Sequence, residues 1–518
     1  MLASEEILRP DQPFGDAEHH RIPRQSAELV ELIDLVPPFT TPLFQHATVI
    51  LGRKGSGKTS IISTYRLAQE FEERFKASRS GRRIQLTTQG DLCISVLTWD
   101  RFYDMNRSVR QKIVFADPTL RSASLIPAEK IEQFWSEVIW EEIFKHFFDF
   151  SRDNNLDNEF KCVRGYFNFD LYIKDISLNN AFSKTFEAAC KEVLTFLAKQ
   201  NKKCYVLFDN MEDYPVLDPV FHQVLTGFLR CVNGFTQQYK EIDVIFCFPE
   251  EIEAYLNLSS SLSSNILKDY QRSFRLRWQT SELWSMALHR YRLFLRKHDH
   301  SSFQRISSLD LSKGEGRRIF IDLLFPATVT NEFGSPEDPI AYVTRHTHLL
   351  PRHLLVILNG IAVRAREKSG QYIPFDNESI KNGIADRERI VATDILALYR
   401  TLYPDLVKEL RKTLPDLQPV FTYGELDKTT NRMNVNELDQ YDLWRVLFQI
   451  GIIGKVEEET DRYFEANFYF NTNGNIGFAS DARYCLHPLF SKFFDVVRRD
   501  GHSRKVVYPK GIEMIDRK

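Results

Sequence analysis

The clearest chemical pattern in the chain is an octapeptide, Gly52-Arg-Lys-Gly-Ser-Gly-Lys-Thr59, which fits the spacing G-x-x-x-x-G-K-[ST] at every required position. Its glycines allow the backbone to curl so that successive N–H groups point inward and surround an anion. In this pattern the lysine reaches the β- and γ-phosphates of a nucleoside triphosphate, and the final hydroxyl binds Mg²⁺. The predicted phosphate-binding residues are Gly52, Gly55, Ser56, Gly57, Lys58, Thr59 and Ser60.

A triphosphate that carries Mg²⁺ also requires a carboxylate, and two apolar runs end in one. Asp209 follows CYVLF and Asp100 follows CISVLTW; Asp209 is preferred because its run is cleanly apolar and further acids follow it. Asp209 would hold Mg²⁺ directly or through water, so the predicted metal ligands are Thr59 and Asp209. The alternative is that Asp209 only caps a turn.

A residue that activates water is marked less directly. Glu212 or Asp213 could orient or deprotonate the attacking water. Asn210 stands where many ATPases carry the catalytic acid, so the pattern supports nucleotide binding more directly than hydrolysis. No N-K-x-D motif for guanine is present, which favours adenine. The expected cofactors are therefore ATP and Mg²⁺.

The elements that must position these residues follow the order strand, glycine loop, helix. The run 46–51 is short, apolar and rich in β-branched residues, and 60–75 has the apolar spacing of a helix. Further buried strands are predicted at 92–97, 204–208 and 242–248, and helices at 127–150 and 181–199. Strands that alternate with helices predict an α/β fold, with a mostly parallel sheet covered on both faces.

The rest of the chain becomes helical from Trp278 onward, and 380–500 mixes short helices with a predicted hairpin, Tyr463–Phe470 and Ile476–Phe478. Helices followed by a hairpin indicate a winged helix. The predicted division is an N-terminal lead-in (1–45), a P-loop core (46–275, with an insertion at about 100–180), a helical lid (276–378), a winged-helix domain (379–500) and a basic tail (501–518).

Composition narrows the classes of function. The 518 residues suggest roughly two to four domains. A formal net charge of −2 gives no overall basic field, so any contact with nucleic acid requires a local patch. The seven scattered cysteines include no CxxC pair, which argues against a disulfide framework or a zinc site. An acidic, polar N-terminus and the lack of a long apolar run predict a cytoplasmic protein without membrane spans.

Taken together, these pieces resemble the bacterial P-loop ATPases related to the STAND, KAP and origin-recognition-like AAA+ groups. The glycine loop is common to P-loop proteins at large, and only the combination points to this family. The matching segments, which run in order along most of the chain, are FGDAE (14–18), ILGRKGSGKTS (50–60), LFDNMED (207–213), the strand with a Pro-Glu ending (244–250), LRWQTSELWSMALHRYR (276–292), LLPRHLLVILN (349–359), LWRVLFQIGIIG (443–454) and HPLF (487–490).

The resemblance implies an ATPase core, a helical lid and a C-terminal winged helix that work as an ATP-dependent switch. It implies that Arg352 is a lid arginine that senses the γ-phosphate, because a guanidinium can bridge lid and nucleotide. Arg290 or Arg292 could act in a neighbouring subunit's site, although an exposed helical arginine is the alternative. Asn210 and the Phe248-Pro249 strand ending depart from the family pattern, which favours slow turnover.

Three functions remain open. The first is a regulatory ATPase of bacterial antiviral defence that controls a separate effector protein, with a homo-oligomer as the expected assembly. The second is a DNA-binding ATPase of DNA metabolism, and the third is a scaffold that binds ATP with little turnover. For DNA contact, the alternative is that the winged helix packs on the core or on another subunit. The candidate basic residues are Lys428, Arg432, Arg445, Lys455, Arg498, Arg499, Arg504, Lys505 and Lys510.

Overall fold

The computed structural model describes residues 7–15, 28–32, 48–70, 92–96, 107–109, 111, 128–153, 159–170, 179–209, 219–258, 272–311, 313–435, 438–472, 477–496 and 505–512. The chain divides into two compact units. One comprises Thr41–Leu51 and Lys58–Arg275, and the other comprises Met1–Thr40, Gly52–Gly57 and Leu276–Lys518. Among the described residues, no helix is both long enough and apolar enough to cross a bilayer.

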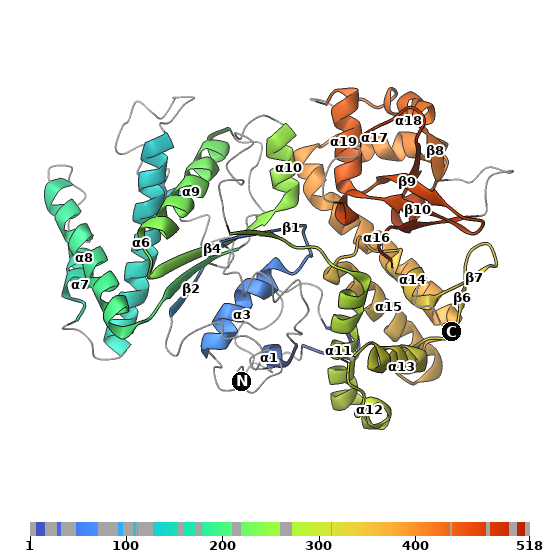
Figure 1. The fold of residues 1–518 in the computed structure, drawn as a ribbon, viewed down its shortest axis with the longest axis horizontal. Coiled ribbons are helices and arrows are strands. Elements are labelled where there is room, and N and C mark those ends of the chain that lie inside the picture. Colours follow the sequence, from blue (N-terminus) through green and yellow to red (C-terminus); the bar gives the residue numbers. More distant parts are fainter. Residues whose placement is uncertain are drawn as a thin grey trace. The chain divides into compact units, whose positions relative to one another are not determined.

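The first unit is built on a five-stranded sheet in the order β2-β3-β4-β1-β5 (Figure 1). Its strands are β1 (Val49–Gly52), β2 (Leu92–Val96), β3 (Cys204–Phe208), β4 (Ile242–Pro249) and β5 (Ser273–Arg275). The pairs β2/β3, β3/β4 and β1/β5 are parallel, and the N–H of Phe246 donates to the carbonyl of Thr48 to join β4 to β1. Every side chain of β3 and β4 is buried, so both faces of the sheet are covered.

The helices of this unit are α3 (Lys58–Glu70), α6 (Ala128–Asp153), α7 (Lys161–Asp170), α8 (Asn179–Gln200), α9 (Pro219–Gln238) and α10 (Glu250–Leu258). The connections β1–α3–β2 and β3–α9–β4 run in opposite directions along the sheet, so right-handed crossovers place α3 and α9 on opposite faces (Figure 1). The prediction of an α/β fold with a parallel sheet is therefore confirmed. The short edge strand β5, Ser-Phe-Arg, lacked the apolar run that marked the other strands.

Aromatic side chains explain how α6 and α9 pack. The indole of Trp135 lies edge-on to Phe228 with ring centroids 4.9 Å apart, and its Nε1 donates to the carbonyl of Val224 at 2.8 Å. The insertion predicted at about 100–180 includes α7, whose Val163 and Tyr166 are buried. The apolar residues of α7 are spaced to lie on one face of a helix. The many polar residues around them made this spacing hard to recognise in the sequence.

Between residues 276 and 402 the described part of the second unit contains six helices, and the backbones of the last two approach each other closely. They are α11 (Thr280–His298), α12 (His300–Ile306), α13 (Gly314–Leu324), α14 (Pro339–Thr344), α15 (Pro351–Ser369) and α16 (Asn377–Leu402), with a two-stranded sheet of β6 (Val329–Thr330) and β7 (Pro336–Glu337). A Cβ on Gly383 would lie 2.5 Å from the Cα of Ile361, and one on Gly360 would lie 2.7 Å from the carbonyl oxygen of Gly383. Only glycines permit this approach of the two helix backbones.

The N-terminal residues belong to the same unit. Phe14 stacks on Tyr291 of α11 with ring centroids 4.4 Å apart. The side-chain amide of Asn359 on α15 accepts from the N–H of Phe14 at 2.8 Å and donates to the carbonyl of Gly15 at 3.0 Å. A short helix, α1 (Glu28–Leu32), follows, and Arg296 of α11 pairs with its Glu31 at 2.5 Å.

The C-terminal part of this unit begins with helices and ends in a sheet of order β12-β10-β9-β11-β8, of which Figure 1 labels β8, β9 and β10. Its elements are α17 (Leu406–Thr413), η4 (Leu414–Asp416), β8 (Val420–Thr422), α18 (Tyr423–Thr430), α19 (Gln440–Ile450), β9 (Ile453–Glu459), β10 (Tyr463–Asn467), η5 (Tyr469–Asn471), β11 (Arg483–Leu486), α20 (Pro488–Phe493) and β12 (Val506–Pro509). The order along the chain is helix, strand, two helices and hairpin, and β11 lies between β8 and β9 in the sheet; the winged helix stays a prediction.

The hairpin was predicted at the wrong place. Its strands are β9 and β10, which are antiparallel and turn at 460–462. Half of β9 is Val-Glu-Glu-Glu with exposed acids, so it lacked the apolar character of a strand. Asn471, predicted to start the turn, instead accepts from the N–H of Phe468 at 2.7 Å, while 473–476 lie outside the described residues.

Part of the predicted basic tail is also a strand. β12 pairs in parallel with β10, and Tyr508 and Val506 pack with Ala341 of α14. The hydroxyl of Tyr508 donates to Glu337, whose carboxylate also lies 3.3 Å from the buried guanidinium of Arg345. Apolar contacts and a buried ion pair therefore hold this segment.

Candidate nucleotide-binding site

The octapeptide joins β1 to α3 through a turn that only glycines adopt without strain. Gly55 has φ +83° and Gly57 has φ +95°, both in the left-handed region. Helix α3 begins at Lys58, whose side chain is only 4% exposed. The segment is thus a strand, a curled loop and the N-terminus of a thirteen-residue helix. This is the context in which the motif binds phosphate.

Asp209 lies directly after β3 and is 2% exposed. The loop follows β1 and Asp209 follows β3 in one parallel sheet, so both stand at the edge formed by the carboxyl ends of the strands. The hydroxyl of Thr59 and the carboxylate of Asp209 are hard oxygen donors, which suit Mg²⁺ when phosphate and water supply the other ligands. Across the described ranges, no group of three or more His, Cys, Asp or Glu forms a metal site from protein ligands alone.

The remaining predicted acids lie outside the described residues. These are Glu212 and Asp213, together with Asn210 and the alternative Asp100. Their predicted roles stay predictions.

The structure adds two acids that the sequence reasoning missed, Glu250 and Glu251. They open α10 directly after β4, the strand between β3 and β1, and are 1% and 6% exposed. Glu250 lies 3.1 Å from Arg275 of β5. The available signal was Pro-Glu-Glu immediately after a buried strand, which places buried carboxylates at the same sheet edge as Asp209.

Arg352, predicted from the resemblance, lies against the glycine loop. It is in the first turn of α15, and its backbone N–H donates to the carbonyl of Gly55 at 3.3 Å. A Cβ added to Gly55 would lie 2.9 Å from the Cβ of Arg352. This position fits an arginine that reaches phosphate, and its sensing role stays a prediction.

Asp394 of α16 holds two cations beside the loop. Its carboxylate lies 3.2 Å from Nη1 of Arg352 and 3.7 Å from Nζ of Lys54. Burial pushes the pKa of Asp394 up, but the charges of Arg352 and Lys54 outweigh it and hold that pKa below its ordinary value. The carboxylate of Asp394 is therefore ionised at neutral pH. It pairs with Arg352 and Lys54, two cations that a phosphate would also attract.

Two further side chains fasten the loop, and the sequence reasoning assigned neither. Nε1 of Trp278 donates to the carbonyl of Ser56 at 2.9 Å. Arg53, an unconstrained position of the motif, is 3% exposed and extends away from the loop. Its Nη1 lies 3.1 Å from Nδ1 of His348 and its Nη2 donates to the carbonyl of Ile450 at 2.9 Å.

Other predicted arginines and lysines are engaged within the chain. Nη1 of Arg290 lies 3.5 Å from the carbonyl of Phe14, and Nη1 of Arg292 donates to the carbonyl of Leu309 at 3.1 Å, so both guanidinium groups contact their own subunit.

Among the candidates for DNA contact, Lys428 and Lys510 are exposed and Lys455 is half-buried. Arg432, Arg445 and Lys505 pair with Asp416, Asp442 and Glu459 at 3.0, 3.5 and 2.7 Å. Arg498, Arg499 and Arg504 lie outside the described residues.

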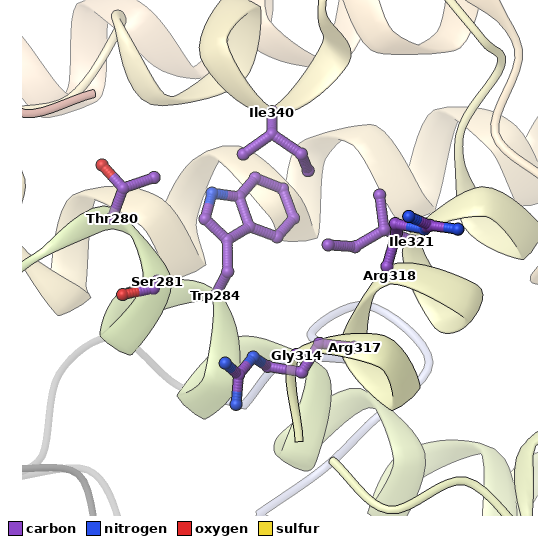
Figure 2. Close-up of a pocket in the computed structure, with 8 residues that line it drawn as sticks. All are labelled: Thr280, Ser281, Trp284, Gly314, Arg317, Arg318, Ile321 and Ile340. Carbon is purple, nitrogen blue, oxygen red and sulfur yellow. The ribbon is translucent and has the colours of Figure 1, made fainter. Parts of the chain in front are cut away.

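A cavity of about 200 Å³ lies among α11, α13 and α14, apart from the predicted site residues. Figure 2 shows the indole of Trp284 facing Ile321 and Ile340, with Arg317 and Arg318 bordering the space. Nε1 of Trp284 lies 3.0 Å from the hydroxyl of Thr344, which fixes the ring. The cavity is mainly apolar and holds none of the groups that the phosphate site requires.

Comparisons with known proteins give the following. No family model matches the sequence. No curated protein matches it either. Among solved structures, Cdc6p from Pyrobaculum aerophilum is 10% identical, with 90% of this chain and 96% of that chain covered and a TM-score of 0.32. The Aeropyrum pernix ORC2 protein is 10% identical in its ADPNP–ADP complexes (91% and 96% covered, TM-score 0.37) and 11% identical in its ADP form (91% and 96% covered, TM-score 0.29).

Proposed function

We propose that the chain binds ATP with Mg²⁺ and works as a slow ATP-dependent switch that controls a partner protein. The observation that carries this proposal is the glycine loop itself, which follows a buried strand, starts a helix and contacts Trp278 and residues of α15, α16 and α19. In this role the loop N–H groups and Lys58 bind the phosphates, while Arg352 approaches from the lid. Magnesium, when bound, neutralises phosphate charge, and Thr59 and Asp209 are the residues that would hold it.

Hydrolysis in this proposal depends on a carboxylate at the sheet edge. Glu212 and Asp213 remain candidates to orient water, and the buried Glu251 joins them. We propose slow turnover because Asn210, and not an acid, follows Asp209. The bound nucleotide would then set the conformational state of the protein, and repeated cycles of hydrolysis would not be needed. The resemblance to STAND and KAP ATPases supports control of a separate effector, with bacterial antiviral defence as the proposed setting.

The experiment that tests nucleotide binding is a titration with a fluorescent ATP analogue in the presence of Mg²⁺. Lys58→Ala should abolish binding, because it removes the cation that reaches the β- and γ-phosphates in this motif. Lys408→Ala, which removes an exposed lysine of α17, is the matched control and should bind like wild type. If Lys58→Ala binds the analogue as wild type does, the assignment of the site is wrong.

The role of Asp209 is tested separately. Asp209→Asn keeps the size of the side chain but removes the charge that attracts Mg²⁺. It should lower Mg²⁺-dependent ATP hydrolysis by about 10- to 100-fold while nucleotide still binds. Hydrolysis at the wild-type rate would show that the metal carboxylate is elsewhere.

A further inference from the structure

Arg53 connects the phosphate-binding loop to the C-terminal part of the chain. It stands two residues before Gly55, yet its guanidinium contacts three segments that are distant in sequence: His348 before α15, Ile450 at the end of α19, and Phe470, whose ring centroid lies 5.7 Å from Cζ. We call these three residues the Arg53 socket. The side chain is 3% exposed, so the contacts are enclosed.

The socket suits a guanidinium for a specific reason. Ile450 is the last residue of α19, whose final carbonyls carry the negative end of the helix dipole. Gly451 follows in the left-handed conformation with φ +83°, and this turn presents the carbonyl of Ile450 to Nη2. Arg53 thereby completes the C-terminal cap of a helix that belongs to another part of the unit.

The second acceptor, His348, is held rigidly. Its ring stacks on Phe470 with centroids 4.6 Å apart and lies edge-on to His487 at 4.7 Å. A Cβ on Gly451 would lie 3.0 Å from Cε1 of His348, so α19 packs directly on this ring. His348 is also just before α15, the helix whose second residue, Arg352, contacts Gly55.

We propose that Arg53 is a positioning residue that links occupancy of the triphosphate cradle to docking of α19 and the C-terminal sheet. The link rests on the proposed function, because it requires that the loop bind a triphosphate. A bound triphosphate fixes the loop around Gly55 and so holds Arg53 in its socket, while loss of the socket leaves the loop less well positioned. Since coupling between two equilibria is reciprocal, docking of α19 must alter nucleotide affinity by the same factor as nucleotide alters the docking equilibrium.

The test uses the full chain and two readouts, ATP-analogue affinity and backbone hydrogen exchange at 447–453 with and without ATP. In wild type, ATP should slow exchange at the end of α19. Arg53→Lys keeps the charge but cannot serve two acceptors with a planar fork, so it should weaken nucleotide binding by about 5- to 50-fold and remove the effect of ATP on exchange. Arg432→Ala, which breaks an exposed pair with Asp416 in the same region, is the control and should change neither.

A second variant approaches the link from the other side. Gly451→Ala strains the left-handed turn and presses on His348, without any contact to the loop. It should weaken ATP binding in wild type, and it should weaken it much less in the Arg53→Lys background, because both changes break one connection. A purely structural role of Arg53 would give additive losses and an ATP effect on exchange that persists.

The outcomes separate this inference from the proposed function. If wild type binds no nucleotide, both are overturned. If wild type and Arg53→Lys bind ATP equally, and ATP still slows exchange in α19 of the variant, only the link through Arg53 is overturned. Arg53→Met serves if Arg53→Lys fails to fold, and the effect of ATP on wild-type exchange tests the link without any variant.

Discussion

At the scale of single residues, we expect the carboxylate of Asp394 to compete with a bound phosphate for the same cations. It lies 3.2 Å from Arg352, which contacts the glycine loop, and 3.7 Å from Lys54, which is a residue of that loop. An arginine that is already paired must give up or share its partner when it approaches a phosphate. The ion pair stabilises the state without nucleotide, and we therefore expect it to lower the affinity of the site for ATP.

Asp394→Asn should consequently tighten ATP binding. The pair is partly exposed, with side chains that are 18% and 25% accessible, so solvent screening limits the gain to about 0.7–1.4 kcal/mol, or roughly three- to tenfold in Kd. Isothermal titration of both proteins with ATP and Mg²⁺ measures the difference. Asp416→Asn, which frees Arg432 away from the loop, is the control. Weaker binding by Asp394→Asn would show instead that Asp394 orients Arg352 toward the phosphate.

Three buried histidines predict sensitivity to mild acid. Burial lowers the pKa of His348 and of His487 well below the ordinary value, and it lowers the pKa of His353 to about 3. These rings stay neutral in the folded chain, while in the unfolded chain they take up protons below about pH 6.5. The unfolded state then binds more protons, so the free energy of unfolding falls as the pH falls from about 6.5 toward 3.

Each such histidine contributes up to about 1.4 kcal/mol per pH unit within that window. Urea unfolding at pH 7 and at pH 5.5, followed by a probe in the second unit, should show the loss. His353→Gln should reduce the pH dependence by about a third, because one of the three rings is gone. A stability that does not change between these pH values would contradict buried, neutral rings.

At the scale of elements, the crossing of α15 and α16 sets the place of Arg352. Gly360 and Gly383 let the two backbones meet, and the same two helices carry Arg352 and Asp394. A shift at the crossing therefore moves the ion pair and the N–H that contacts Gly55.

Gly383→Ala should destabilise the second unit by about 1–3 kcal/mol, because the new methyl group would meet backbone atoms of Ile361. It should also weaken ATP binding. Thermal unfolding and the analogue titration measure the two effects. In contrast, Gly165→Ala in α7, where nothing lies within 4 Å of the added atom, should be neutral or slightly stabilising. Equal effects of the two substitutions would show that the helices do not cross closely at Gly383.

At the scale of the whole molecule, the sequence predicted the parts that depend on local pattern. The octapeptide lies between a strand and a helix as expected, and the run Cys204–Phe208 is β3 with the same bounds. The contacts of Arg53 could not be predicted from the sequence, because His348 is 295 positions away and the motif accepts any residue at position 53. The β9–β10 hairpin was predicted at the wrong place because the exposed acids of β9 are not typical of a strand. Pairing with β10, which the sequence does not show, makes this segment a strand.

The DNA hypothesis also belongs to this scale. Three of the candidate cations, Arg432, Arg445 and Lys505, are paired with acids, and the arginines that stay candidates for phosphate contact are Arg498, Arg499 and Arg504. Neutralising these three arginines should weaken any DNA binding and lower its salt dependence by about two to three units of slope. Fluorescence anisotropy at several salt concentrations measures both quantities. An unchanged slope would exclude these arginines from the interface.

The clasp between Asn359 and the N-terminal residues has a consequence for chemical ageing. Asn359 uses both ends of its amide, accepting from Phe14 and donating to Gly15, and it is followed by Gly360. In a flexible chain, asparagine before glycine readily loses ammonia and becomes an acid. Such a product would turn a donor into an acceptor opposite the carbonyl of Gly15, and the clasp would be replaced by repulsion. While α15 stays helical, the backbone nitrogen needed for this attack is held away, so the rate of deamidation at Asn359 would record how often the helix opens.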